Sequence, residues 1–240
     1  MSIKDKLITI SENIPKVYDA GVAQGVAEGK KSEYDKFWDA CQDYGNRTNY
    51  ERAFAGIGWT DANFYPKYDI RLEGETNAQA FHANQVTNLK QRLEECGVVL
   101  DTSKCAFMYQ TFQQSVSKVL PTIDMRNATS STNYCFYNCE AETIEKVIIS
   151  EQTNLAATTF GAMWELKNIT IEGVIAKGGL TFNASHNLTK ASITSIINAL
   201  SPTTSGLAIT LSQTAVNKAF TTSEWDALIA TKTNWTISLV

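Results

Sequence analysis

The stretch FYNCEAETIEKVI at residues 136–148 has two counterparts at an interval of 24 residues. They are FQQSVSKVLPTID at residues 112–124 and FGAMWELKNITIE at residues 160–172. Each stretch begins with phenylalanine and carries a β-branched residue eleven positions later. Two series therefore recur in phase, namely Phe112, Phe136, Phe160 and Ile123, Val147, Ile171. One further step of 24 back from Ile123 reaches Val99, in the apolar run at 98–100. Two series in phase indicate internal repeats rather than coincidence.

The repeat length predicts a particular fold class. A period of 24 lies in the range of leucine-rich repeats, which is about 20–29 residues. One strand with its return segment cannot bury its own apolar face, but stacked units share a continuous core. We therefore expect an α/β protein whose residues 96–185 form a short leucine-rich-repeat solenoid with parallel strands. The 27 threonines suit such a stack, because threonine tolerates strand geometry.

The same repeats predict a surface. If Val99, Ile123, Val147 and Ile171 point inward, the residues on either side of each point outward. Outward strand faces of solenoids often bind partners. Neither outward row shows a catalytic pairing, so we regard them as a possible binding face. It comprises Thr122, Lys146 and Thr170 in one row, and Asp124, Ile148 and Glu172 in the other.

The first 44 residues predict a helical stalk. Its apolar residues are spaced 4, 3, 4 and 3 apart, as in a coiled-coil seam, and are Ile3, Leu7, Ile10, Ile14 and Val17. A single amphipathic helix packed on its own domain is the alternative, but its stripe would be wider. Pro15 either starts a new helix or kinks this one. Glycines at every fourth position from Gly21 to Gly29 allow close backbone approach or a flexible joint.

Two further segments complete the expected domain organisation. Residues 45–95 are rich in glycine and aromatic residues, which we interpret as core filling rather than a carbohydrate platform. Residues 186–240 predict an α/β cap, with helices near 189–200 and 223–230 and strands near 207–212 and 235–240. Within this cap, residues 186–223 carry only two charged side chains. Such a surface would suit other subunits or a neutral partner.

Composition excludes several function classes. The net charge of −4 lacks the basic excess of nucleic-acid binders. No apolar run reaches the ~18 residues of a membrane span, and no signal peptide is visible at the start. Five cysteines cannot all pair within one chain, and the Cys135–Cys139 spacing fits no common metal motif, so we expect buried reduced thiols. Only His82 and His186 are present, and nothing singles out a catalytic residue. We therefore expect no enzyme, cofactor or metal.

Two resemblances rest on motifs quoted from this chain. The runs Cys-Phe-Tyr-Asn-Cys to Glu-Lys-Val-Ile-Ile and Thr-Phe-Gly-Ala-Met to Lys-Asn-Ile-Thr-Ile-Glu-Gly resemble the short leucine-rich repeats of Bacteroides-type surface proteins. The whole chain resembles a group of gut proteins often found in phages and prophages of Firmicutes. The shared order is Glu-Asn-Ile-Pro-Lys-Val-Tyr-Asp-Ala-Gly, Tyr-Asp-Lys-Phe-Trp-Asp, Lys-Asn-Ile-Thr-Ile-Glu-Gly-Val-Ile and a terminal Asn-Trp-Thr.

This resemblance implies a non-enzymatic virion appendage, such as a tail-fibre, baseplate or head-fibre protein. We expect the stalk to form a homo-oligomer, as a trimer, and to contact other virion proteins. The repeats would present a surface to a host receptor, either protein or glycan, with no membrane insertion. The alternatives are a bacterial cell-surface adhesin and an intracellular interaction module. Virions leave by lysis, so the virion assignment needs no export signal.

Overall fold

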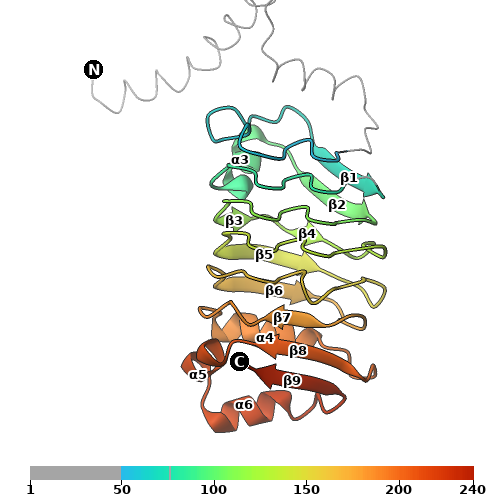
Figure 1. The fold of residues 1–240 in the computed structure, drawn as a ribbon, viewed down its shortest axis with the longest axis vertical. Helices are drawn as coiled ribbons and strands as arrows, with labels where there is room; N and C mark the ends of the chain where they lie inside the picture. The colour runs from blue at the N-terminus through green and yellow to red at the C-terminus, as the bar shows by residue number, and fades with distance from the viewer. Residues whose placement is uncertain (1–49, 76) are drawn as a thin grey trace, which may run out of the picture. The chain divides into compact units, whose positions relative to one another are not determined.

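The structure, a computed structural model, describes residues 50–75 and 77–240. They belong to the second of two compact units, Asn46–Val240. Figure 1 shows its strands lying one beneath another in chain order. The elements are β1 (Ile70–Gly74), α3 (Leu89–Cys96), β2 (Leu100–Cys105), β3 (Val119–Leu120), β4 (Ile123–Asp124), β5 (Thr143–Ile148), β6 (Asn168–Glu172), β7 (Leu180–Phe182), α4 (Lys190–Ala199), β8 (Leu207–Leu211), α5 (Gln213–Ala219), α6 (Thr222–Ile229) and β9 (Trp235–Leu239).

The strands are parallel but form three small sheets instead of one. β1 pairs with β2, and β7, β8 and β9 form another sheet. Between them, β5 pairs with β6 on one side and with the two-residue strands β3 and β4 on the other. The expected leucine-rich-repeat solenoid is therefore wrong. The described residues form a mixed α/β fold with short parallel sheets and four helices.

Hydroxyl side chains explain why the middle sheet ends at β6. The backbone N–H groups of Ile169 and Ile171 donate to the hydroxyls of Ser192 and Ser195, at 3.0 and 2.8 Å. The two serines are three residues apart on α4 and therefore share one face of that helix. The free edge of β6 is thus covered by a helix, and β7 starts a new sheet.

Strand register within the middle sheet follows the interval of 24 residues except at the start of the β5–β6 pair, where Thr143 pairs with Asn168 and the register then shifts. Ile123 pairs with Val147, and Val147 pairs with Ile171. All three side chains are buried, as expected. Val99 departs from the series because it is 60% exposed, whereas Leu100 is buried and pairs with Ile70. Helix α3 lies between the turn of Phe81 and this strand, so the spacing of the later layers does not hold here.

A column of buried phenylalanines runs through the layers. Adjacent ring centroids are 4.8–5.5 Å apart, and adjacent planes lie within 25° of parallel. Aromatic pairs of this kind contribute about 0.5–1.5 kcal/mol each beyond their buried area. The column consists of Phe54, Phe81, Phe112, Phe136, Phe160 and Phe182. The sequence repeat thus continues, at unequal intervals, on both sides of residues 112–160.

The turns around these rings contain residues in the left-handed region. Their φ values lie between 53° and 59° although none is glycine, which costs about 1–2 kcal/mol per residue. They stand two residues before or after a column phenylalanine and are Arg52, Gln79, Ala83, Gln110, Gln114, Tyr134, Asn138 and Ala162. This geometry directs alternate N–H groups to the next layer. Around Phe112, for example, the N–H groups of residues 110, 112 and 114 donate to three successive alternate carbonyls at 2.7–3.1 Å.

Threonine hydroxyls connect the layers inside the body. Thr102 accepts from the N–H of Asp124 at 2.8 Å and donates to its carbonyl at 2.9 Å. The hydroxyls of Thr132 and Thr159 lie 2.8 Å apart, and Thr153 donates to the carbonyl of Met125. These threonines are buried, and a buried hydroxyl without a partner would be costly. Of these four residues only Thr102 lies in a strand, so their hydroxyls have a role different from the strand preference predicted from the sequence.

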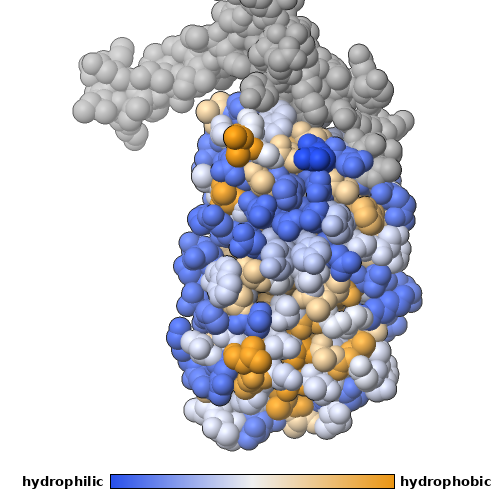
Figure 2. Space-filling model, in the orientation of Figure 1, coloured by the Kyte–Doolittle hydropathy of each residue, from blue (hydrophilic) through white to orange (hydrophobic). Residues whose placement is uncertain are grey.

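The C-terminal part uses helices where the preceding layers use turns. The expected helices and strands are present as α4, β8, α6 and β9, and α5 is an additional short helix. Hydroxyl residues cap α4, α5 and α6, as Thr189, Ser212 and Thr221 each accept from a backbone N–H in the first turn. Figure 2 shows apolar side chains gathering over this end of the face that it displays. None of the residues of α6 is fully buried.

The expected stalk lies outside the described residues. Its seam of Ile3, Leu7, Ile10, Ile14 and Val17 falls within residues 1–49. Among residues 50–75 and 77–240, no helix combines the length and apolar character of a membrane crossing.

The aromatic residues near the N-terminal end of the body mainly fill its core. Tyr50, Phe54, Trp59 and Phe64 are buried, which confirms the interpretation as core filling for these four. Tyr65 is 47% exposed and lies under the guanidinium of Arg92, whose carbon is 4.6 Å from the ring centroid.

The cysteines of the described part are free thiols. Cys105, Cys135 and Cys139 are buried, and Cys96 is half-buried. Burial raises the pKa of Cys139 to about 12 and that of Cys105 to about 11. Such thiols are poor nucleophiles and poor metal ligands, because the thiolate is the reactive form. The expectation of buried reduced thiols is confirmed for these three residues.

Candidate binding surface

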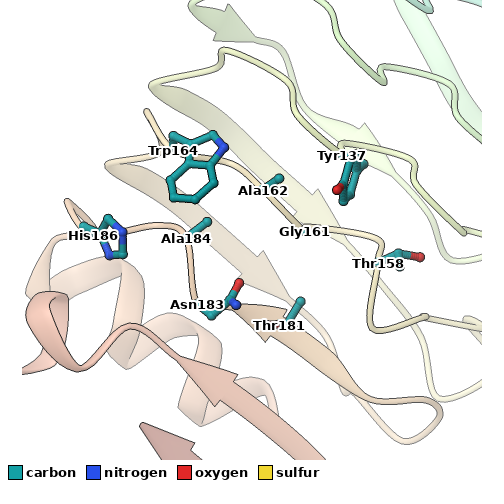
Figure 3. A pocket seen from close by; sticks show the side chains of 9 residues that line it. All are labelled: Tyr137, Thr158, Gly161, Ala162, Trp164, Thr181, Asn183, Ala184 and His186. Atoms are coloured by element: carbon teal, nitrogen blue, oxygen red, sulfur yellow. The ribbon is translucent and has the colours of Figure 1, made fainter. Parts of the chain in front are cut away.

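A hollow of about 510 Å³ opens beside the last three phenylalanines of the column, of which Phe136 and Phe160 lie in turns and Phe182 ends β7. Figure 3 shows Trp164 and His186 on one side of it, and Tyr137 and Thr158 on the other. Small residues lie between these walls. The complete lining is Tyr137, Thr158, Gly161, Ala162, Trp164, Thr181, Asn183, Ala184 and His186.

The phenylalanine column places these residues. Tyr137, Gly161 and Asn183 each directly follow a column phenylalanine, and the side chains of Tyr137 and Asn183 reach the surface. Gly161 makes room for its neighbour in the preceding layer. A Cβ atom at position 161 would lie 3.0 Å from Cδ2 of Tyr137. The absence of a side chain therefore lets the tyrosine ring lie close to the turn.

Trp164 is the most exposed aromatic side chain of the hollow. It is 55% exposed, and its ring centroid lies 5.9 Å from that of His186. The Nδ1 atom of His186 lies 2.8 Å from the hydroxyl of Ser212, a buried residue that caps α5. The wall formed by these two rings is thus connected to the helical part of the body.

Further aromatic rings continue the hollow toward earlier layers. Tyr137 meets Tyr134 edge to face at 5.2 Å, and Tyr134 meets Tyr109 at 6.3 Å. Tyr109 stacks on Phe107 with centroids 5.9 Å apart. All four rings are half-buried, so each presents part of its surface to solvent. We call the row formed by Phe107, Tyr109, Tyr134 and Tyr137 the aromatic track.

Uncharged polar groups surround the rings of the hollow. Within the part of the chain that the structure describes, no hydrogen bond occupies the indole N–H of Trp164, the hydroxyl of Tyr137 or the side-chain amide of Asn183. The Thr158 hydroxyl accepts from the N–H of Tyr134 at 3.3 Å. None of the nine lining residues is Asp, Glu, Lys or Arg. The hollow therefore offers flat apolar faces and free hydrogen-bonding groups without a formal counter-charge.

The structure brings together much of the binding face that the sequence predicted. Asp124, Ile148 and Glu172 occupy one register row across β4, β5 and β6. Lys146 pairs with Glu172 at 2.7 Å, the Thr122 hydroxyl lies 3.3 Å from Glu145, and Thr170 is exposed. Three of the six residues also line a second, smaller hollow of about 360 Å³, and these are Thr122, Asp124 and Ile148.

Charged groups on this predicted face are already paired within the protein. Asp124 accepts hydrogen bonds from the Arg126 side chain, at 3.0 Å from Nε and 2.6 Å from Nη2, and from the Arg126 backbone N–H at 3.0 Å. Hydrogen bonding to Glu172 raises the pKa of Lys146 and keeps it protonated. An incoming ligand would have to compete with these pairs. The hollow at Trp164 does not impose that cost, and we therefore regard it as the better candidate.

Catalytic and metal-binding groups do not converge in the described residues. No group of three or more His, Cys, Asp or Glu side chains there could hold a metal ion. His82 is far from the hollow in sequence, and its pKa is lowered by burial and, to a lesser degree, by the charge of Arg52. His186 contacts Trp164 and Ser212.

Trp164 and Tyr137 were not among the residues predicted from sequence. Our prediction concentrated on the strands, whereas these residues lie in the turns. A usable signal existed, because position 137 directly follows a repeating phenylalanine and position 164 follows the next one by four residues. The spacing alone does not show that Gly161 leaves space between them. No protein-family model, no curated protein and no solved structure matches this chain.

Proposed function

We propose that this protein acts by binding, as an appendage of a phage particle, and that the hollow around Trp164 contacts the host surface. The appendages considered are a tail fibre, a baseplate and a head fibre. The appendage assignment draws on the resemblance to proteins of gut phages and prophages. The assignment of the contact draws on the geometry of the hollow.

The single observation that carries the binding role is the exposure of Trp164 in a hollow formed by three successive layers. Large aromatic side chains are usually buried, and exposed ones beside a depression are enriched in recognition sites. Here the surrounding backbone is held by hydrogen bonds between layers, such as Asn138 N–H to Gly161 carbonyl at 3.1 Å. A pre-organised site loses little conformational entropy on binding.

Mass spectrometry of purified particles tests the appendage assignment. The particles would be induced from the bacterium that carries the gene and separated from cell debris by density gradient. We expect this protein to co-purify in fixed ratio to the capsid protein. Its presence in the envelope of uninduced cells, combined with its absence from particles, would favour the cell-surface adhesin instead.

Competition for adsorption tests the binding role. Purified protein added in excess should slow the adsorption of these particles to host cells, because it occupies the same receptors. The Trp164→Ala variant should compete at least tenfold less effectively. The Tyr65→Ala variant serves as a matched control, because Tyr65 is an exposed aromatic residue outside the hollow. Equal competition by all three proteins would contradict a role for the hollow.

A further inference from the structure

We infer that the hollow around Trp164 binds a neutral sugar ring of a cell-surface glycan. This inference rests on the proposed function and names the ligand class of its site. A pyranose ring carries C–H groups on its faces and hydroxyl groups around its edge. It therefore requires a flat apolar surface beneath it and hydrogen-bonding groups beside it.

The two aromatic walls supply the apolar surface. In Figure 3 the rings of Trp164 and Tyr137 stand on either side of Ala162, with Gly161 close to the tyrosine. Gly161, Ala162 and Ala184 project little or no side chain, so the floor between the rings stays shallow and open. The volume of about 510 Å³ lies within the range of about 300–1,000 Å³ that is usual for small-molecule sites.

Polar groups lie where the edge of such a ring would be. Figure 3 places Thr181 and Asn183 along one margin, Thr158 near Tyr137, and His186 near Trp164. Together they provide donors and acceptors in hydroxyl, amide and imidazole groups. Sugar hydroxyls both donate and accept, so a margin with both types of group matches them better than a margin of donors only.

Charge and shape argue against the other common ligand classes. A phosphate or a sialic acid carboxylate would need a cation, and none of the nine lining residues is lysine or arginine. A nucleic-acid strand would need a basic groove along its backbone. An extended peptide would gain most from an unpaired strand edge, whereas this hollow is formed by turns. A neutral sugar satisfies the available groups without leaving a charge unpaired.

The neighbouring aromatic track suggests how a longer glycan would extend. Tyr134 contacts Tyr137 directly, and Tyr109 follows one layer further. Tyr134 and Tyr137 belong to the turn around Phe136, and Tyr109 belongs to the turn around Phe112, so consecutive sugar units could contact rings of two successive layers. On this basis we expect oligosaccharides to bind more tightly than the corresponding monosaccharide.

A glycan array tests the ligand class directly. The full-length protein, labelled at an introduced tag, would be applied to arrayed neutral and acidic bacterial polysaccharides and defined oligosaccharides. We expect saturable binding to neutral glycans, lowered at least tenfold by Trp164→Ala and less by Trp164→Phe, which retains an aromatic face. Asn183→Ala should lower binding several-fold, whereas Tyr65→Ala should leave it unchanged.

A spectroscopic readout separates the site from a general loss of folding. Trp164 is exposed, so its replacement should leave the midpoint of urea unfolding nearly unchanged. Addition of the best neutral oligosaccharide should shift the indole N–H resonance of Trp164 in a proton–nitrogen NMR spectrum. The indole resonances of Trp59 and Trp235 should not shift, because both N–H groups donate to backbone carbonyls at 3.0 Å.

The possible outcomes distinguish this inference from the proposed function. Binding confined to acidic glycans, or no binding that depends on Trp164, would overturn the neutral-sugar inference. If adsorption competition still depended on Trp164, the binding role would stand with another ligand class. If competition were also independent of Trp164, the role of the hollow in host contact would fail. Neutral-glycan binding by a protein absent from particles would overturn only the appendage assignment.

Discussion

Two regions of this body, residues 107–172 and residues 180–240, both contain short parallel strands. They differ in the segments that connect one strand to the next. In the first region, turns with left-handed non-glycine residues pass around a buried phenylalanine. In the second, capped helices α4, α5 and α6 cross between strands. A helix forms hydrogen bonds within itself except at its two ends, whereas each turn depends on the layer beneath it.

The two regions obtain their order from different sources. The turns of the first region carry local backbone strain, which is offset only when neighbouring layers supply acceptors and ring contacts. The helices of the second region carry their own start signals in Thr189, Ser212 and Thr221. We therefore expect the first region to respond most strongly to changes in the column, and the second to respond moderately to changes in its caps.

Truncation of a column ring should have the largest effect. Phe136 is fully buried and stacks on Phe112 and Phe160 at 5.5 and 5.2 Å. Phe136→Ala should lower the free energy of unfolding by about 3–5 kcal/mol, because it removes a buried ring and leaves a cavity. Urea unfolding followed by circular dichroism measures this change.

A ring of the helical region provides the control for this substitution. Phe220 is half-buried and lies 5.8 Å from Trp225 at a tilted angle. Phe220→Ala should therefore cost distinctly less than Phe136→Ala. Equal costs for the two variants would show that the column does not dominate the stability of the first region.

Substitution of the glycine at the junction of the two regions should have the second-largest effect on stability. Gly178 has φ of 76°, and a Cβ there would lie 1.7 Å from the carbonyl oxygen of Leu155. Gly178→Ala must move the backbone and should lower the free energy of unfolding by about 3 kcal/mol, combining left-handed strain with the clash.

Gly206 is a matched control, because its φ is 78° and nothing lies within 4 Å of an added Cβ. Gly206→Ala should cost only about 1 kcal/mol, the cost of the left-handed conformation alone. Thermal unfolding of both variants, compared at equal pH, separates the two contributions. The clash argument would be refuted if both substitutions had the same effect.

Removal of a helix cap should have a moderate effect on the second region. The Thr221 hydroxyl accepts from the backbone N–H of Glu224, and the Glu224 carboxylate accepts from the backbone N–H of Thr221. Thr221→Ala should lower the free energy of unfolding by about 1 kcal/mol. Thr222→Ala, at the first position inside the helix, should have almost no effect. Hydrogen exchange on α6 should accelerate in the first variant alone.

Replacing a residue of left-handed backbone conformation by glycine should stabilise the first region slightly. Gln114 is exposed and has φ of 58°. Gln114→Gly removes a strain of about 1–2 kcal/mol and adds unfolded-chain entropy of about 0.5–1 kcal/mol, so a net gain of about 0.5 kcal/mol is expected. Gln114→Val should instead destabilise, because β-branched residues tolerate this region poorly. A loss of stability in the glycine variant would show that the side chain of Gln114 contributes contacts that outweigh its strain.

Lowering the pH should have the smallest effect on stability, and this effect should arise in the second region. Hydrogen bonds from Lys190 and then from Thr221 lower the pKa of Glu224 from 4.5 to about 2. Because the folded pKa is depressed, its contribution is present above pH 4.5 and disappears as the pH falls toward 2. Glu224→Gln should flatten the decline of the urea midpoint between these pH values.

The exposed position of Glu224 keeps this difference small, and salt should reduce it further. Measurement of the wild-type and Glu224→Gln midpoints in low and in 1 M sodium chloride, roughly a 3 Å Debye length, checks this expectation. A difference that is unaffected by salt would contradict an electrostatic cause.

Sequence patterns predicted local elements well and sheet continuity poorly. The positions of α4, β8, α6 and β9 could be predicted because apolar periodicity and cap residues are local signals. Burial of Ile123, Val147 and Ile171 followed from the repeat. The end of the sheet at β6 depends on Ser192 and Ser195, which look like ordinary helix residues until α4 is placed beside the strand.

The candidate hollow shows the same division. Its rings belong to separate turns at residues 137 and 164, and no local pattern relates them. Stacking of Phe136 on Phe160 brings the two turns together, and Gly161 leaves the space between them. A sequence search that looks for paired functional residues therefore favours the strand rows over the turns.

The interval of 24 residues and the inward positions of the central strands were already evident in the sequence. These features depend on side-chain periodicity, which a chain carries wherever it folds. Only the tertiary structure decided that the sheets are separate, that six phenylalanines form one column and that Trp164 faces a hollow. Those features depend on which hydrogen-bond donors and rings meet across layers, and such contacts exist only after the chain has packed.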